Sequence, residues 1–346
     1  MRVRERRSLL ALVPVALALV VAGCDGTRTS SPSAAPDRAP PVPRTVGEWK
    51  TDFSKHLVPL AEFQSGGPPK DGIPAIDHPH FTQARRVDWL ENREPLILLR
   101  LRGETRGYPL QILVWHEIVN DRVGGAPVAV TFCPLCNTAI AFDRLLGERV
   151  LSFGTTGKLR DSDLVMYDRS TESWWQQFSG DALVGTLAGS ELRQLPARIV
   201  SWSEFRRMHP SALVLDRHTG FARSYGENPY GGYDDVASPP FFGARNGDDH
   251  RLLPKERVVY VQVGEEAYAV PFAKLAAVRR ISIDSDAGQL VVRWHPGVAS
   301  ALDAATIAEG RSVGAADVTL DGRPVPFSEP FWFAVAAFRP DVEIVR

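Results

Sequence analysis

The sequence shows no excess of either charge and has few cysteines. Lys and Arg number 40 against 41 Asp and Glu in 346 residues, a formal net charge of -1. A balanced chain offers no electrostatic attraction to a phosphate backbone, so nucleic-acid binding is excluded. Cysteine occurs only three times, so the positions of the cysteines matter more than their number.

The remaining composition is that of a globular protein rather than a disordered, collagenous or multispanning one. Hydrophobic residues make up 44% and charged residues 23% of the chain. Gly and Pro, with 28 and 27 residues, each stand at roughly 8%, above their usual shares of about 7% and about 5%. This composition favours many turns and short strands over long helices.

The first 24 residues have the three-part form of a secretory signal. An Arg-rich start precedes an apolar run at residues 9–22, and Val21-Ala22-Gly23-Cys24 resembles a bacterial lipobox. The apolar run is shorter than the ~20 residues that a spanning helix needs. We therefore expect residues 1–24 to be a lipoprotein signal peptide, Cys24 to carry the lipid, and the protein to be extracytoplasmic and anchored to the cell membrane.

Residues 25–46 are rich in Pro, Ser and Ala without an apolar period, which predicts a disordered tether. Beyond it, alternation predicts strands at residues 96–102, 128–132 and 139–142. Apolar residues at helical spacing predict a short helix before Asn120. We expect a β-rich α+β fold of short strands with small helices.

An internal repeat is the most informative feature of the organisation. A shift of 162 positions superposes Glu94 on Glu256 and Pro109 on Pro271, and a second match at another shift superposes Trp202 on Trp332. The first copy must therefore hold extra residues, which include residues 154–162. The sequence predicts a tandem duplication, with a first half at 47–235 that carries the reactive residues and a degenerate second half at 236–346.

The strongest chemical signal is Cys133-Pro134-Leu135-Cys136-Asn137. A Pro after the first Cys, between two β-like segments, resembles the knuckle turn of rubredoxins and zinc ribbons. The residue after the second Cys of such a turn needs a positive φ, which Asn tolerates next best after Gly. A knuckle supplies two ligands, whereas tetrahedral zinc needs four, so further ligands must come from elsewhere in the chain.

Four polar residues near the predicted helix are the first candidates for the rest of this site. His116 is the candidate third ligand or proton-handling neighbour, and Glu117 lies within the apolar stripe, where a carboxylate needs a partner or a raised pKa. Glu117, Asn120 and Asp121 are the expected second shell. The alternatives are a structural His116, a Glu-Arg pair and a capping role for Asp121.

Three uses of the cysteine pair remain open. They are a soft-metal site, with copper favoured over zinc by thiolate and imidazole ligands, a thiol-disulfide exchange pair, and a structural disulfide. Geometry separates them, since ligation requires a His116 nitrogen within about 4 Å of a sulfur and a disulfide requires sulfurs ~2.05 Å apart. The rival to a metal or redox protein is a non-catalytic envelope binding or scaffold protein stapled by this disulfide, with an unknown protein or small-molecule partner.

The residues also carry a family resemblance, from about residue 66 to residue 235 and more weakly to the C-terminus. The chain resembles the family called domain of unknown function 3179 in Trp115-His116-Glu117-Ile118-Val119-Asn120-Asp121, Thr131-Phe132-Cys133-Pro134-Leu135-Cys136, Phe153-Gly154, Met166-Tyr167-Asp168, Glu172-Ser173-Trp174 and Gly180. The resemblance implies a secreted or lipid-anchored protein. It implies no particular reaction.

Overall fold

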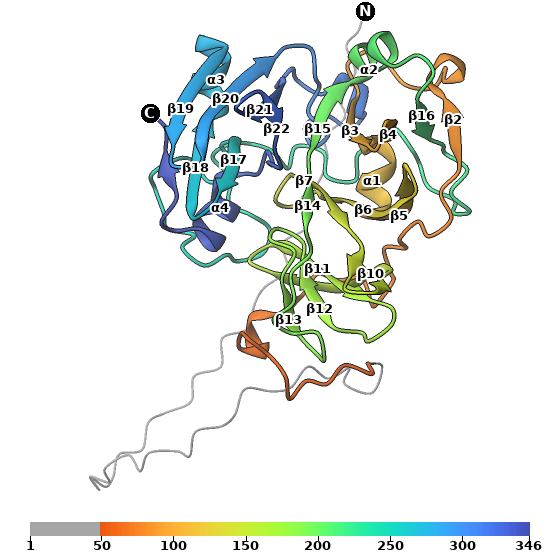
Figure 1. Cartoon of the computed structure of the whole chain (residues 1–346), viewed down its shortest axis with the longest axis vertical. Helices are drawn as coiled ribbons and strands as arrows, with labels where there is room; N and C mark the ends of the chain where they lie inside the picture. The colour runs from red at the N-terminus through yellow and green to blue at the C-terminus, as the bar shows by residue number, and fades with distance from the viewer. Residues whose placement is uncertain (1–48) are drawn as a thin grey trace, which may run out of the picture. The chain divides into compact units, whose positions relative to one another are not determined.

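Five small sheets arranged as the blades of a β-propeller make up residues 49–346, the part of the chain that the computed structural model describes (Figure 1). Strands account for 40% of the described residues and helices for 12%. The expected β-rich chain of short strands with small helices is thus confirmed, whereas the propeller arrangement was not predicted. The predicted signal peptide with Cys24 and the predicted tether lie outside the described residues.

Three sheets come from the first two thirds of the chain. Sheet 1 has the order β15 (Ala197–Ser201), β3 (Pro95–Leu101), β4 (Glu104–Pro109), β16 (Leu213–Leu215) and β2 (Phe81–Gln83). Sheet 2 has the order β14 (Gln194–Leu195), β7 (Thr138–Asp143), β6 (Ala126–Cys133) and β5 (Ile118–Val123). Sheet 3 has the order β1 (Gln64–Ser65), β10 (Phe153–Arg160), β11 (Asp163–Asp168), β12 (Trp174–Gln176) and β13 (Ala182–Val184).

The other two sheets come from the last third. Sheet 4 has the order β17 (Val258–Val263), β18 (Glu266–Pro271) and β23 (Glu343–Ile344). Sheet 5 has the order β19 (Arg280–Ser285), β20 (Gly288–His295), β21 (Ala315–Leu320) and β22 (Arg323–Pro324). A separate hairpin is formed by β8 (Leu145–Leu146) and β9 (Arg149–Val150).

Short helices connect these strands. The α-helices are α1 (Leu110–His116), α2 (Trp202–Met208), α3 (Phe272–Val278) and α4 (Trp332–Phe338), and the 3-10 helices are η2 (Leu60–Glu62), η3 (Ala84–Arg86) and η4 (Ile307–Glu309). Within residues 49–346, no helix has both the length and the apolar character needed to cross a membrane.

The sheets form a closed ring of contacts. Sheet 3 meets sheet 2 through β10 and β5, sheet 2 meets sheet 1 through β7 and β15, and sheet 1 meets sheet 5 through β15 and β21. Sheets 4 and 5 meet through helix α3, which directly follows β18 of sheet 4 and packs on β20 of sheet 5. Phe178, which follows β12, closes the ring by packing against Tyr260 of β17, with ring centroids 5.4 Å apart.

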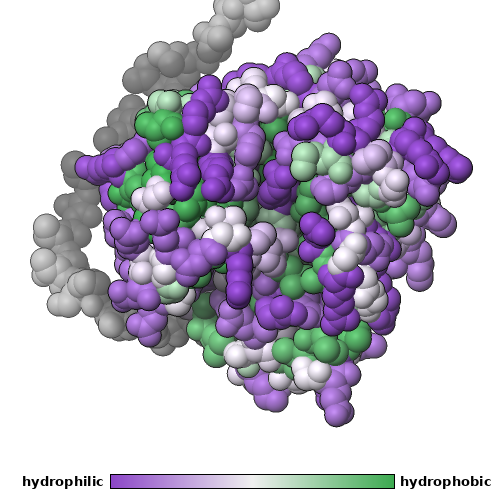
Figure 2. Space-filling model, turned by 45° about the horizontal axis from the view of Figure 1, so that its top comes forward, coloured by the Kyte–Doolittle hydropathy of each residue, from purple (hydrophilic) through white to green (hydrophobic). Residues whose placement is uncertain are grey.

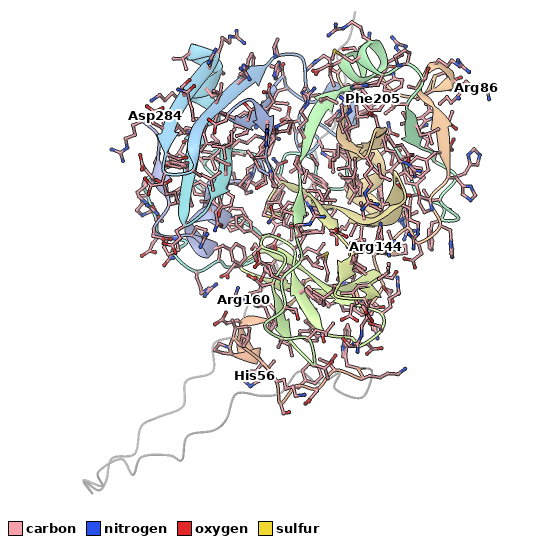
Figure 3. The ribbon with its side chains drawn as sticks, viewed as in Figure 1. His56, Arg86, Arg144, Arg160, Phe205 and Asp284 are labelled. Carbon is pink, nitrogen blue, oxygen red and sulfur yellow. The ribbon has the colours of Figure 1, made fainter. Side chains whose placement is uncertain are left out.

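The apolar stripe of α1 explains why this helix forms where the sequence predicts it. Leu110, Leu113 and Val114 are all at most 2% exposed and belong to the largest hydrophobic core, together with Ile118, which lies at the start of β5 and not in the helix. Gly107 in β4 shows how closely this region packs, because a Cβ there would lie 2.5 Å from Leu96 Cδ1. Phe205 of α2, labelled in Figure 3, lies on the same side of that glycine.

Two segments of the chain have the same order and length of elements. Adding 162 to the bounds of β4, α1, β5 and β6 gives the bounds of β18, α3, β19 and β20. Adding 130 to the bounds of α2 gives those of α4, and the strands that follow these helices, β16 and β23, both pair in parallel with their sheets. The largest difference falls between β7 and β14, where residues 144–193 contain the β8–β9 hairpin and most of sheet 3, whereas β21 and β22 are separated by only residues 321–322.

A buried arginine anchors the start of this additional segment to sheet 2. The guanidinium of Arg144 (Figure 3) donates to the carbonyls of Val128 at 2.9 Å, Leu151 at 2.6 Å and Asp121 at 3.0 Å. These three bonds join both ends of the β8–β9 hairpin to strands β5 and β6. The start of the additional segment is therefore held against sheet 2.

Candidate metal centre

The two cysteines lie at the turn between β6 and β7. Cys133 is the last residue of β6, and Asn137 immediately precedes β7. Asn137 has φ of 58°, the positive value that the knuckle pattern predicts. Its side-chain amide donates to the carbonyl oxygen of Glu329 at 2.7 Å, and Phe331 N donates to Cys136 O at 2.9 Å. The turn is therefore fixed by residues from the opposite end of the chain.

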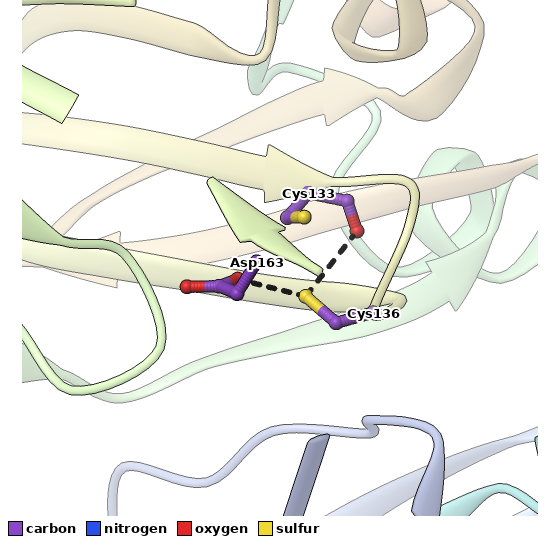
Figure 4. A group of neighbouring side chains, drawn as sticks. All are labelled: Cys133, Cys136 and Asp163. Atoms are coloured by element: carbon purple, nitrogen blue, oxygen red, sulfur yellow. Dashed lines mark hydrogen bonds between the residues drawn. The ribbon is translucent and has the colours of Figure 1, made fainter. Parts of the chain in front are cut away.

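Cys133 and Cys136 are free thiols, 1% and 0% exposed. Neither geometric condition set by the sequence is met, because the sulfurs are not bonded to each other and His116 is not their neighbour, so the metal site in its predicted form, with His116 as a ligand, is not present. Asp163, the first residue of β11, takes the place expected for His116. One oxygen of its carboxylate and the two sulfurs all lie within 4.8 Å of one another (Figure 4).

Neighbouring strands hold the Asp163 carboxylate in place. Cys136 Sγ donates to Asp163 Oδ1 at 2.8 Å. The other oxygen, Oδ2, accepts from Gln176 Nε2 at 2.6 Å and from Phe178 N at 2.9 Å. Thr138 Oγ1 lies 2.9 Å from Cys136 Sγ on the opposite side. Cys136 and Asp163 therefore have fixed orientations before any ligand binds.

Glu117 adds a second buried carboxyl group to this cluster. It is 7% exposed, and no hydrogen bond to its carboxylate is found among the described residues. Burial and the nearby charge of Asp163 raise the pKa of Glu117 to about 8. Burial likewise raises the pKa of Asp163 to about 6, against the lowering effect of its hydrogen bonds.

All four groups of the cluster are acids, and burial raises the pKa of every one, including both thiols. In the described part of the chain, no Lys, Arg or His is among the groups that shift the pKa of Glu117 or Asp163 most strongly. A buried cluster of this kind either keeps its protons or binds a cation that replaces them.

The backbone of Glu117 is unusual, but it does not mark the site. Glu117 ends α1 with φ of 58° and ψ of -32°. Arg279 ends α3 at the corresponding position with φ of 67° and ψ of -26°. The left-handed residue at the helix end is therefore common to both segments, and only the carboxylate at this position is special to the first.

His116, the predicted third ligand, lies outside the cluster because both ring nitrogens have other partners. Nδ1 lies 2.7 Å from Pro74 O and therefore carries the hydrogen, because a carbonyl only accepts. Nε2 lies 2.6 Å from the hydroxyl of Tyr225, which donates to it. Burial lowers the pKa of His116, and nearby Arg223 acts in the same direction. His116 thus binds Tyr225 in the segment that connects β16 of sheet 1 to β17 of sheet 4, and it does not bind a metal ion together with the cysteines.

Asn120 and Asp121, expected in the second shell, are also engaged elsewhere. The side chain of Asn120 donates to Asp77 and to Phe153 O and accepts from Phe153 N. Asp121 binds Arg106 at 2.8 Å through both oxygens and accepts from Tyr108 at 2.6 Å. These bonds join strands of sheets 1, 2 and 3, so both residues have structural roles, and of the predicted second shell only Glu117 lies at the cluster.

Residues 216–257, the connection between β16 and β17, contribute to the cover of the site. Tyr233 OH donates to Leu135 O within the cysteine turn at 2.9 Å. The charges of Glu117 and Cys133 both act on Tyr230, which places its phenol beside the cluster. The loop that contains these tyrosines, Asn228-Pro229-Tyr230-Gly231-Gly232-Tyr233, therefore lies at the candidate site.

A cavity of about 950 Å³ lies behind Asp163, between sheets 3 and 4. Gln176 and Phe178 belong to its lining. The same two residues bind the Asp163 carboxylate, so they separate the cluster from the cavity. Arg160 (Figure 3) also lines it and donates to Gln176 Oε1 at 3.3 Å.

Asp163 was missed as a site residue because its neighbours suggest a different interpretation. Asp161, Asp163 and Asp168 lie close together in sequence, and such acids most often form solvated turns. One signal in the sequence could have identified Asp163, because it directly precedes the apolar run Leu164-Val165-Met166-Tyr167 of a strand. A polar residue on a strand that is buried on both faces requires a buried partner.

Comparison with known proteins identifies a family. The family model described as "Protein of unknown function (DUF3179)" matches residues 70–342, most of the chain. No curated protein and no solved structure matches. The matched range contains both cysteines, Glu117 and Asp163.

Proposed function

The chain belongs to the DUF3179 family of proteins of unknown function, and on that premise we propose that it is an extracytoplasmic lipoprotein that binds one zinc ion. Cys133, Cys136 and Asp163 are the protein ligands. Three protein ligands leave one position of a tetrahedral ion open, and Glu117 is a further buried carboxyl group whose charge acts on Cys133. In the metal-free chain, a pKa raised to about 8 keeps the proton on Glu117 at neutral pH.

One observation carries this proposal: two thiols and two carboxyl groups are buried together without a basic side chain to balance them. Burial of unpaired ionised groups costs several kcal/mol each. A divalent cation removes that cost, since it binds the thiolate and carboxylate forms directly and releases their protons.

The donor set favours zinc over copper. The sequence favours copper because it predicts an imidazole, that of His116, as the third ligand. The structure supplies a carboxylate instead, and carboxylates are hard ligands that suit soft Cu(I) poorly, whereas zinc accepts both thiolate and carboxylate.

Thiol-disulfide exchange is less well supported by the same geometry. Reactive cysteines have a lowered pKa and partial exposure. Here both sulfurs are buried, and burial raises the pKa of both thiols. A thiol that is neutral and shielded attacks a disulfide slowly.

Competition between metals tests the proposal. The purified chain is incubated with zinc and with copper under reducing conditions, dialysed against a weak chelator, and analysed for metal content. We expect about one zinc per chain and less copper than zinc. Retention of no metal, or of copper in preference to zinc, would contradict the assigned donor set.

Substitution of His116 separates its role from that of the ligands. His116→Gln is expected to leave the zinc content unchanged and to lower the free energy of unfolding by about 1 to 2 kcal/mol, because the bonds to Pro74 and Tyr225 are lost. Tyr225→Phe, which removes the bonds of the Tyr225 hydroxyl to His116 and Thr219 but leaves the bond of His116 to Pro74, is the matched control and should cost about 1 kcal/mol. Loss of zinc from His116→Gln would restore His116 as a ligand.

Membrane anchoring is proposed from the sequence alone, because residues 1–24 lie outside the described part. The basic start, the apolar run and the small residues before Cys24 support a lipidated N-terminus. Cys24→Ser is expected to move the protein from the membrane fraction to the soluble fraction while leaving the zinc content unchanged. A variant that stays in the membrane fraction would show that the segment anchors the chain in another way.

We also infer that the fold arose by tandem duplication. The matching element bounds, the shared left-handed residue at the ends of α1 and α3, and the parallel pairing of β16 and β23 support this. On this view the segment 144–193, with most of sheet 3, is an insertion into the first copy. That insertion supplies Asp163 and so accounts for a metal site in only one half.

A further inference from the structure

A groove of about 1170 Å³ lies between sheets 1 and 5, away from the cysteine cluster. Its walls come from β3, β15 and α2 on one side and from β20 to β22 on the other. Figure 2 tilts the top of Figure 1 forward, and on that face hydrophobic surface lies between hydrophilic side chains. None of the residues assigned to the metal site lines this groove.

Basic side chains gather along the sheet 1 side of the groove. Arg100 and Arg207 are exposed, and His209 is half-buried. Among the described residues, neither arginine has an acidic partner within ion-pair distance. Burial lowers the pKa of His209, and the positive charges of Arg100 and Arg198 lower it further, which shows that these groups lie close together.

The acids of the groove do not offset this positive charge, because each already has a basic partner. Glu204 binds Arg198 at 2.9 Å. Asp317 pairs with His295 and lies 3.3 Å from Arg293. The charges of Arg100 and Arg207 therefore remain available to a ligand.

The rest of the lining is apolar. Val318 and Phe327 are 2% and 8% exposed, and Leu98 and Val325 are half-buried. Met208 at the end of α2 is 53% exposed. Methionine adapts its shape readily to an apolar ligand. The groove thus combines a positive edge with an apolar floor, the two features that an amphipathic anion requires.

We propose that this groove binds a small amphipathic organic anion, with its acidic group at Arg100, Arg207 and His209 and its hydrocarbon body against Val318, Val325 and Phe327. The acidic group is a carboxylate, sulfonate or phosphate, which arginine binds through paired hydrogen bonds. This site is independent of the proposed zinc ion.

Titration with 8-anilinonaphthalene-1-sulfonate, a fluorescent amphipathic anion, tests the proposal on the purified chain. We expect saturable binding at one site, displaced by dodecanoate but not by equal concentrations of acetate or inorganic phosphate. Absence of saturable binding, or equal displacement by phosphate, would overturn the proposal, since the first shows no site and the second shows a site without an apolar part.

Charge reversal locates the binding. Arg100→Glu with Arg207→Glu is expected to weaken probe binding about tenfold or more. Arg122→Glu with Arg149→Glu makes the same change of net charge at two exposed arginines that do not line the groove, and should leave the affinity unchanged. An equal loss in both double variants would show a general charge effect and overturn the assigned site.

Two further arms complete the experiment. Cys133→Ser should bind the probe normally, so a failure of the zinc proposal leaves this one intact. Sedimentation with phosphatidylglycerol vesicles distinguishes the source of the anion: co-sedimentation that depends on Arg100 and Arg207 indicates a membrane lipid, and dodecanoate displacement without co-sedimentation indicates a soluble amphiphile.

Discussion

Cys136→Ser and Asp163→Ala are each expected to reduce zinc affinity about 100-fold, the largest effect that the structure predicts. A structural zinc ion contributes about 10 to 16 kcal/mol through its ligands, so the loss of one ligand costs about 3 kcal/mol, or a factor of about 100. Elemental analysis after dialysis and competition with a chromophoric zinc chelator measure this loss. Saturating zinc should also raise the Tm of the wild-type chain by ~10 °C, and that of the variants far less.

The chain offers a matched control for each substitution. Cys24→Ser changes the remaining cysteine of the chain, which the proposal assigns to the lipid anchor and not to the zinc ion. Asp161→Asn removes a buried carboxylate two residues from Asp163, but one that binds Arg245 at 2.7 Å. Both controls should retain about one zinc ion, whereas loss of zinc from Asp161→Asn would point to a disturbed β10–β11 turn rather than to lost ligation.

Glu117→Gln is expected to stabilise the metal-free chain at pH 8, by up to about 5 kcal/mol, and to leave its stability near pH 4 almost unchanged. The pKa of Glu117 rises from 4.5 to about 8 on folding, and each unit corresponds to about 1.4 kcal/mol. Below pH 4.5 both states hold the proton. As the pH rises to 8, the unfolded state loses its proton first, so the free energy of unfolding falls. The glutamine cannot ionise, and this loss disappears.

Denaturant unfolding in the presence of EDTA at several pH values measures this effect. Glu172→Gln is the control for which the change in stability has the opposite sign. Glu172 also has a positive φ, of 56°. It pairs with Lys70 at 2.8 Å, and this pairing and its hydrogen bonds lower its pKa. That variant should be less stable than the wild type at pH 8. If Glu117→Gln is destabilised in the same way, then Glu117 has a stabilising partner and the site needs no cation.

The cysteine turn was predictable because its signals are local. Cys133, Cys136 and the positive φ of Asn137 follow from five consecutive residues, and the stripe of α1 follows from helical spacing. Asp163 and not His116 is the neighbour of the two sulfurs because this contact depends on how sheet 3 packs against sheet 2, and no periodicity in either segment predicts that packing. Likewise, the burial of Glu117 was predictable from its position in the stripe, whereas its proximity to Asp163 was not.

The order of elements in the second segment was partly predictable, since the bounds of β4, α1, β5 and β6 recur 162 residues later in β18, α3, β19 and β20. The ring of five sheets was not, because ring closure depends on contacts between segments remote in sequence, such as that of Phe178 with Tyr260. Short strands with many turns are compatible with several β architectures, so composition alone could not select this one.

The bond from Phe331 N to Cys136 O has a consequence for biosynthesis. It joins residues almost 200 positions apart, and Asn137 binds Glu329 across a similar separation of 192 residues. Because a chain is synthesised from its N-terminus, the two cysteines are incorporated long before the residues that enclose them. During this interval an oxidising environment could link the sulfurs, and a disulfide would exclude the metal ion. Maturation of the site thus becomes a competition between oxidation and completion of the last 20 or so residues, and a chain truncated before Glu329 should be the form most readily oxidised.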